Sequence, residues 1–181
     1  MSDRYIAGPQ GRMAVSLSGE GQGNPTLFVH SDGGTLHHWD DIRGRFSNRT
    51  TAAFDRRGHG NSAAPNNGLF DQTEGADDIA TVADALGFAK FIWVAHSGGA
   101  ANAVTFAGSY AGRLAGLVLV DPPLDPDSLP PRMLNQQIDA MKKDYAATSE
   151  RYYRTLAGND PGVVNRVLAD VRSTPKQTWH A

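Results

Sequence analysis

The sequence predicts an α/β fold in which a mostly parallel β-sheet is flanked by helices. Three observations support this prediction. Short apolar runs without polar alternation, as at 26–30 and 91–95, are typical of strands buried on both faces. Segments with helically spaced apolar residues separate these runs, which indicates a parallel sheet covered by helices on both sides. Beyond residue 121 only helical patterns follow, so the chain is expected to end in an all-helical segment.

Composition narrows the functional classes. The chain has 181 residues, of which 40% are hydrophobic, and this suits one sizeable core. Its 17 Lys and Arg against 19 Asp and Glu give a net charge of −2, which argues against a nucleic-acid partner. The absence of cysteine removes disulfides and thiolate nucleophiles. No apolar stretch has the length of a signal peptide or a membrane span, so we expect a cytoplasmic protein with a small-molecule substrate and no membrane partner.

The first elements are short. Residues 12–17 alternate in polarity and end at a turn-rich stretch, which predicts a strand followed by a loop. The apolar run 26–30 predicts a buried strand. Trp39, Ile42 and Phe46 then fall at i, i+3 and i+7, the spacing of one helical face. Residues 50–54 predict the next strand.

The middle of the chain repeats the alternation of helix and strand. Residues 71–87 predict a helix that ends at Gly87, with one apolar stripe formed by Ala76, Ile79, Ala80, Ala83 and Leu86. The buried strand 91–95, a helix over 97–110 and a fourth buried run over 117–120 follow. The carboxyl ends of such strands are where α/β proteins gather functional groups.

The composition changes after Asp121. A proline-rich stretch over 122–131 predicts a linker. Beyond it, the spacing of Leu134, Ile138, Met141 and Tyr145 predicts one amphipathic helix. Asp160 and Pro161 form an N-cap followed by proline at the first helical position, which predicts a second helix. We therefore divide the chain into a core over 1–122 and a helical segment over 123–181.

Ser97 is the strongest candidate for a nucleophile. It stands between the apolar strand 91–95 and a helix rich in small residues, at a turn that would project its hydroxyl. Such a turn crowds the positions two before and two after the serine, and Ala95 and Gly99 satisfy that demand. The motif is AxSxG, so it departs from strict GxSxG at its first position. The alternative is a small-residue turn that carries a serine with no chemical role.

Four segments in order resemble the α/β-hydrolase family. They are the run 27–34 (LFVHSDGG), which is similar to the family's oxyanion loop, 55–62 (DRRGHGNS), which is similar to its DxRGHGxS segment, 94–99 (VAHSGG) and 117–122 (LVLVDP). The resemblance covers about residues 12–122. It implies that Ser97 is the nucleophile and that the backbone N–H groups of Asp32 and Gly98 form the oxyanion hole, without cofactor or metal. The family usually has glycine where this chain has Ser31.

The histidines are the candidates for a base. His96 precedes Ser97, and its side chain is expected to point to the opposite side of the turn and to pack, while remaining a neighbour of the substrate site. By resemblance, His30 braces the loop and His59 forms a turn. His37 and His38 either border the substrate pocket or lie in solvent. His180, in the helical tail, is the candidate base only by elimination.

The acid is equally open. Asp121 follows the strand after the nucleophile helix, a position that some family members use for the acid, and a turn-capping role is the alternative. The proline-rich exit and the helices after it resemble the start of the family's helical cap. Because no later buried strand follows, we hypothesise that the chain is an N-terminal part of a longer hydrolase or one half of a split enzyme.

Three functions follow from these patterns. The leading one is a serine hydrolase that acts on a carboxylic ester or related carbonyl compound by acyl transfer. The second is a catalytically incomplete protein that binds ligands, serves as a scaffold or needs a complementing C-terminal segment. The third is a cofactor-free haloperoxidase-like or carbon–carbon bond hydrolase. A sheet that lacks its last strands also exposes an edge, so self-association is a further expectation.

Overall fold

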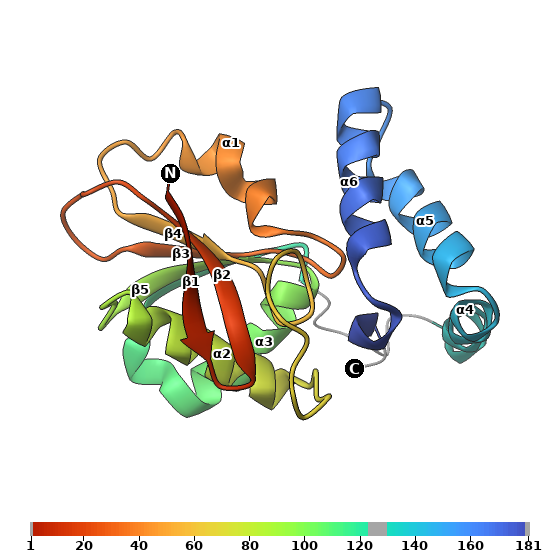
Figure 1. Ribbon diagram of the computed structural model, residues 1–181, viewed down its shortest axis with the longest axis horizontal. Coiled ribbons are helices and arrows are strands. Elements are labelled where there is room, and N and C mark those ends of the chain that lie inside the picture. Colours follow the sequence, from red (N-terminus) through yellow and green to blue (C-terminus); the bar gives the residue numbers. More distant parts are fainter. Residues whose placement is uncertain (1, 123–129, 180–181) are drawn as a thin grey trace.

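The computed structural model describes residues 2–122 and 130–179, and within them a six-stranded sheet dominates. Its order is β1-β2-β4-β3-β5-β6 (Figure 1). The strands are β1 (Ser2–Gly8), β2 (Gly11–Ser18), β3 (Thr26–Val29), β4 (Thr51–Phe54), β5 (Phe91–His96) and β6 (Leu114–Val120). β1 pairs with β2, and β2 with β4, in antiparallel fashion, whereas β4, β3, β5 and β6 are parallel. The predicted α/β fold with a mostly parallel sheet is confirmed.

Helices cover the sheet and form the C-terminal segment. On the core these are η1 (Leu36–Trp39), α1 (Asp40–Arg43), α2 (Gln72–Ala85), α3 (Gly98–Tyr110) and η2 (Ala111–Arg113). The C-terminal helices are α4 (Pro131–Lys143), α5 (Tyr145–Leu156), α6 (Pro161–Ser173) and η4 (Lys176–Trp179). Within the described ranges, no helix is both long and apolar enough to cross a membrane.

Two hydrophobic clusters lie on opposite faces of the sheet. On one face the large cluster joins the strands to α2 and α3, with Trp93 and Phe106 fully buried and in edge-to-face contact at a centroid distance of 5.2 Å. On the other face a smaller cluster joins Phe28 of β3 to Leu36 and Trp39 of η1. Figure 1 shows α1 on one side of the sheet and α2 and α3 on the other. The central strands are thereby covered on both faces, as parallel strands require.

The helix around Trp39 differs from the prediction. The buried positions are Leu36, Trp39 and Arg43, whereas Ile42 is 45% exposed. Arg43 occupies the inner face because its guanidinium donates to the carbonyl oxygens of Ser16 (3.0 Å) and Thr51 (3.4 Å). A buried cation that donates to two carbonyl oxygens and lies 3.6 Å from the Asp40 carboxylate therefore replaces the apolar residue that the spacing predicts.

Two further elements depart from the expected pattern. β1 was not predicted, and it forms because every residue from Ser2 to Gly8 pairs in register with β2. The helix predicted through Tyr145 ends at Lys143, and a separate helix α5 begins at Tyr145. Asp144 causes the break, because its backbone is non-helical and its side chain accepts from the N–H of Ala147 at 3.1 Å as an N-cap.

The run around 117–120 was expected to be buried, and this expectation is wrong. β6 lies at one edge of the sheet, and Leu117, Val118 and Val120 are 40%, 47% and 41% exposed. Within the described residues the strand pairs with β5 along one side, and it contacts α3. The apolar composition of β6 therefore matches a buried strand, although its surroundings in this chain are those of an edge.

The C-terminal helices lie beside the carboxyl ends of the strands (Figure 1). Side-chain hydrogen bonds attach them to the core. The Tyr153 hydroxyl of α5 donates to the carbonyl oxygen of Asp32 at 2.7 Å, and His38 Nε2 lies 2.7 Å from the Asp170 carboxylate of α6. The Thr178 hydroxyl donates to the carbonyl oxygen of Gly58 at 3.3 Å. These bonds place the helices over the loops that carry the candidate site.

Candidate active site

Ser97 occupies a strained turn between β5 and α3. Its backbone has φ 48° and ψ −120°, a left-handed φ that a residue with a side chain rarely adopts. The turn is held because the N–H of Ser97 donates to the carbonyl oxygen of Val120 at 3.0 Å, and its own carbonyl oxygen accepts from the N–H of Ala100 at 2.7 Å. Strain that the surrounding structure maintains is typical of functional positions. The conformation agrees with the strand–turn–helix geometry of a nucleophile elbow.

The two glycines after Ser97 are required by close contacts. A Cβ on Gly98 would collide with the carboxylate of Asp32. A Cβ on Gly99 would lie 2.5 Å from the carbonyl oxygen of His30, a backbone atom that has no freedom to move aside. The start of α3 therefore approaches the loop after β3 more closely than any side chain permits. The sequence Ser97-Gly98-Gly99 brings the turn and that loop together.

His30 braces the loop that follows β3. Its Nε2 accepts from the N–H of Arg56 at 2.9 Å, so its Nδ1 carries the proton and donates to the carbonyl oxygen of Ser31 at 2.7 Å. Burial, followed by the charges of His59 and Arg56, holds the pKa of His30 well below its usual value. A neutral ring with both nitrogens occupied serves as a structural link between the ends of β3 and β4.

Asp32 joins this loop to Arg56 through an ion pair of 2.6 Å. Burial acts to raise the pKa of the Asp32 carboxyl, but the charge and hydrogen bond of Arg56 outweigh it, and the net shift is downward. The carboxylate is therefore ionised at neutral pH and lies against Gly98. The backbone carbonyl oxygen of Asp32 accepts a hydrogen bond from the Tyr153 hydroxyl. The Asp32 residue is thus fixed at both its side chain and its backbone.

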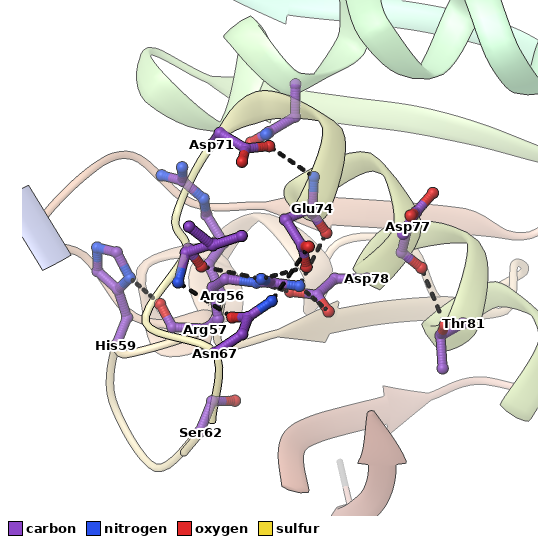
Figure 2. A network of polar contacts seen from close by, with 12 residues as sticks. Arg56, Arg57, His59, Ser62, Asn67, Asp71, Glu74, Asp77, Asp78 and Thr81 are labelled. Atoms are coloured by element: carbon purple, nitrogen blue, oxygen red, sulfur yellow. Dashed lines mark hydrogen bonds and ion pairs between the residues drawn. The ribbon is translucent and has the colours of Figure 1, made fainter. Parts of the chain in front are cut away.

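The loop between β4 and α2 is fixed by Arg57 (Figure 2). Its guanidinium binds Asp78 of α2 with two bonds of 2.6 and 2.8 Å and also reaches the Glu74 carboxylate at 2.8 Å. Asp55, at the start of the loop, accepts from the backbone N–H groups of Leu36 and Asn61. These buried bonds hold Arg56 and His59 in place at the carboxyl end of β4.

Two cavities flank the elbow. A polar cavity of about 210 Å³ is lined by residues that include Arg56, His59, Gln72, Gly98 and Asn102. A second, mainly apolar cavity of about 140 Å³ lies under the C-terminal helices and is lined by residues that include Ser31, His38, His96, Tyr153 and Leu156. Asp32 lines both cavities. Gly98 lines the polar cavity and His96 the apolar one, and Ser97 stands between these two residues in the sequence.

Among the residues predicted for the site, the structure brings together Ser31, Asp32, His96, Ser97 and Gly98. His96, which was expected to pack at the turn beside the substrate site, is half-buried and lines the apolar cavity. Burial lowers the pKa of His96, and the charge of Asp121 partly offsets this.

The candidates for base and acid have different outcomes. His38 lines the apolar cavity and pairs with Asp170, whereas His37 is exposed and pairs with Asp40. Asp121 is exposed and, like Ser97, has φ 48°. His180 lies outside the described residues, so its predicted role as a base stays a prediction. Among the described histidines, none has a hydrogen bond to Ser97.

No role was assigned from the sequence to three residues of this site. They are Arg56, Tyr153 and Asp170, whose partners are 24, 121 and 132 residues away in sequence. Arg56 occupies the variable position of the DRRG run, and its only signal in the sequence was its place at the carboxyl end of the predicted strand 50–54. In the described ranges, no cluster of three or more His, Cys, Asp or Glu has the arrangement of a metal site.

Comparison with known proteins agrees with this geometry. A family profile described as "alpha/beta hydrolase fold" matches residues 24–163. The chain is 32% identical over 143 residues to a 2-(acetamidomethylene)succinate hydrolase of Mesorhizobium japonicum, covering 78% of this chain and 49% of that protein. It is 30% identical over 166 residues to a non-heme haloperoxidase of Rhodococcus erythropolis, covering 88% and 60%. The chain thus spans about half to three fifths of the length of these curated relatives.

Solved structures show the same fold. An esterase from Exiguobacterium antarcticum matches with a TM-score of 0.82 at 17% identity, over 96% of this chain and 69% of that one. A hydrolase from Pseudomonas aeruginosa matches with a TM-score of 0.81 at 21% identity, over 97% and 69%. The strained serine turn, the sheet order and the matched profile lead to one conclusion: the chain belongs to the α/β-hydrolase fold family.

Proposed function

We propose that this chain carries the nucleophile half of a serine hydrolase that acts by acyl transfer on a carboxylic ester or related carbonyl compound. Ser97 attacks the carbonyl carbon, and the backbone N–H groups of Asp32 and Gly98 stabilise the oxyanion. The ester bond then breaks with protonation of the leaving alcohol, and water releases the acyl group. The observation that carries the proposal is the left-handed backbone of Ser97 between a buried strand and a helix N-terminus.

The relatives support the class of reaction and leave the substrate open. The similar proteins are named as hydrolases, an esterase and a haloperoxidase. A haloperoxidase-like or carbon–carbon bond hydrolase therefore remains the alternative reaction. All of these matched proteins are longer than this chain, so the activity of the whole protein is part of the proposal.

A second candidate function is a catalytically incomplete hydrolase that binds ligands or works only with a complementing segment. Two observations favour it. Among the described residues no histidine has a hydrogen bond to Ser97, and the apolar strand β6 lies exposed at the sheet edge next to Asp121. A partner that pairs with this edge would complete both the sheet and the site.

Hydrolysis of p-nitrophenyl butyrate tests the proposal. The Ser97→Ala variant is expected to lose at least about 10³-fold in kcat/KM, because the attacking oxygen is removed. Ser109→Ala is the matched control, since it removes an exposed hydroxyl from the far end of the same helix α3. Equal loss in both variants, or activity that survives Ser97→Ala, overturns the proposal. Reaction of Ser97 with a fluorophosphonate probe without ester turnover supports the incomplete form.

A further inference from the structure

We propose that the polar cavity beside the elbow is a binding site for a carboxylate that carries a neighbouring hydroxyl or amide N–H group. It would hold the polar arm of the substrate, so the inference deepens the proposed function and rests on it for the position of the reacting carbonyl. Two residues that line the cavity support it. The Arg56 guanidinium is bound to Asp32 through one nitrogen, and the buried Nε2 of His59 has no hydrogen-bond partner among the described residues.

Arg56 supplies the positive charge. Its Nη1 donates to Asp32 at 2.6 Å, and its backbone N–H donates to His30. Within the described part of the chain, its Nε and Nη2 groups have no hydrogen-bond partner, and the residue lines the polar cavity. Only Nη1 is bound to Asp32, so Nε and Nη2 remain for a ligand carboxylate. The cavity lining also contains the Arg57–Asp78 ion pair, whose charges offset each other.

Arg57 provides the contrast within the same loop. All three nitrogens of its guanidinium are bound, to Asp78, Glu74 and the carbonyl oxygen of Leu69 (Figure 2). The two adjacent arginines therefore have different roles. Arg57 is a structural anchor with no free donor, whereas Arg56, which lines the cavity, retains donors without a partner among the described residues.

His59 supplies a hydrogen-bond acceptor. Its side chain is 3% exposed, and its Nδ1 lies 3.0 Å from the carbonyl oxygen of Arg57, so Nδ1 carries the proton. Its Nε2 is buried and has no partner among the described residues. Burial, and then the charge of Arg56, lowers the pKa of His59 to about 4, so the ring is neutral at pH 7. A buried acceptor without a donor is energetically unfavourable, and a ligand hydroxyl or N–H would satisfy it.

The position of the cavity connects it to the chemistry. Asp32 and Gly98, whose N–H groups we assign to the oxyanion hole, both line it. Asn102 adds an amide whose nitrogen has one weak bond, of 3.4 Å, to the carbonyl oxygen of Gln72. A cavity of about 210 Å³ is small for a whole substrate and suits one short arm. The apolar cavity on the other side of Asp32 would take a second, apolar arm.

Three small ligands of similar size separate these contributions. They are 3-hydroxybutyrate, butyrate and 1,3-butanediol, which carry carboxylate and hydroxyl, carboxylate only, and hydroxyls only. Binding is measured by NMR titration in the Ser97→Ala background, which excludes turnover. We expect 3-hydroxybutyrate to bind about tenfold more tightly than either other ligand, because each of those lacks one charge-assisted or acceptor contact. Equal affinities for the three, or no binding, overturn the inference.

Variants locate the site. Arg56→Gln is expected to weaken 3-hydroxybutyrate to the affinity of the neutral diol, and the double variant Asp32→Asn with Arg56→Gln does the same without leaving a carboxylate unpaired. Arg154→Gln is the matched control, because Arg154 forms an ion pair with Glu150 on the exposed side of α5. Carboxylate binding that survives both cavity variants overturns the inference. Failure of ester hydrolysis in the wild-type chain would count against the proposed function and would leave this binding result intact.

Discussion

Strands β5 and β6 are neighbours in one sheet, and the residue after each strand has the same φ, but the two strands differ in burial. Each is followed by a residue with φ 48°, Ser97 after β5 and Asp121 after β6. Trp93 of β5 is fully buried, whereas Val118 of β6 is 47% exposed. The two neighbours of Ser97 in the sequence, His96 and Gly98, each line a cavity, while Asp121 is exposed. Among the described residues, the chain thus places the candidate nucleophile directly after the packed strand, whereas the neighbouring strand lies at an exposed edge.

The stability of the two strands gives the largest expected contrast. Trp93→Ala removes a fully buried indole that packs on Phe106, so we expect the free energy of unfolding to fall by about 3–5 kcal/mol. Val118→Ala on the exposed strand is expected to lower it by less than about 1 kcal/mol. Urea unfolding of both variants measures the difference. A loss at Val118 as large as that at Trp93 would mean that β6 is covered in solution, which would contradict the described difference in burial between the two strands.

The second contrast concerns the stability of the folded chain in acid, because the loop between β4 and α2 contains His59, a buried and neutral histidine. His59 has a pKa of about 4 in the folded chain, against about 6.5 for an unfolded histidine. Between these values the unfolded chain binds more protons, so the free energy of unfolding falls as the pH drops from about 6.5 to 4. The expected contribution is at most about 3 kcal/mol.

Urea unfolding at several pH values, in the wild type and in His59→Gln, tests this sign. The variant is expected to lose less stability between pH 6.5 and 4, since its side chain does not titrate. His37→Gln is the control, because His37 lies in the short helix η1 and is exposed to solvent. Parallel pH profiles for the wild type and His59→Gln would show that the folded chain does not hold His59 neutral.

The two ends of α3 provide a third contrast. Gly99→Ala, at the elbow, brings a Cβ within 2.5 Å of the His30 carbonyl oxygen, and the resulting displacement should lower stability by about 1–3 kcal/mol. Gly108→Ala, in open space near the other end of the helix, should raise it by about 0.5–1 kcal/mol through helix propensity. Thermal unfolding of both variants measures the signs. Two stabilising substitutions would show that the elbow is less tightly packed than described.

The smallest expected effect concerns the link between the C-terminal helices and the loop after β3. Tyr153→Phe removes the hydroxyl that donates to the Asp32 carbonyl oxygen, at a cost of about 1 kcal/mol. We also expect slower reaction of Ser97 with a fluorophosphonate probe, because the peptide that follows Asp32 is no longer held. Tyr152→Phe, on the exposed neighbour, is the matched control. Equal probe rates in the two variants would show that this hydrogen bond does not position the loop.

The sequence predicted those parts of the molecule whose causes are local. The elbow was recognisable because a tight turn demands small residues next to Ser97, and the buried strands were recognisable from their uninterrupted apolar runs. The pairing of Arg56 with Asp32, and of His38 with Asp170, was not predictable. Each joins residues far apart in sequence, and only the assembled sheet and helices bring them together.

The error at β6 has a physical origin of the same kind. A strand such as Leu114–Val120 has the same apolar composition whether or not another element covers it. The apolar composition of β6 is compatible with burial, but whether the strand is buried depends on which other elements pack against it. β1 was not predicted because its sequence is largely polar and lacks the apolar run of a buried strand. It forms a strand through pairing with β2.

Mapping of a covalent adduct tests the central claim most directly. The intact chain is treated with a fluorophosphonate at neutral pH, digested, and analysed by tandem mass spectrometry while circular dichroism confirms that it is folded. We predict a single modified residue, Ser97, because its hydroxyl lies on a strained turn beside the N–H groups assigned to the oxyanion hole. Modification of a different residue, or none in the folded chain, would contradict the proposal that Ser97 is the nucleophile.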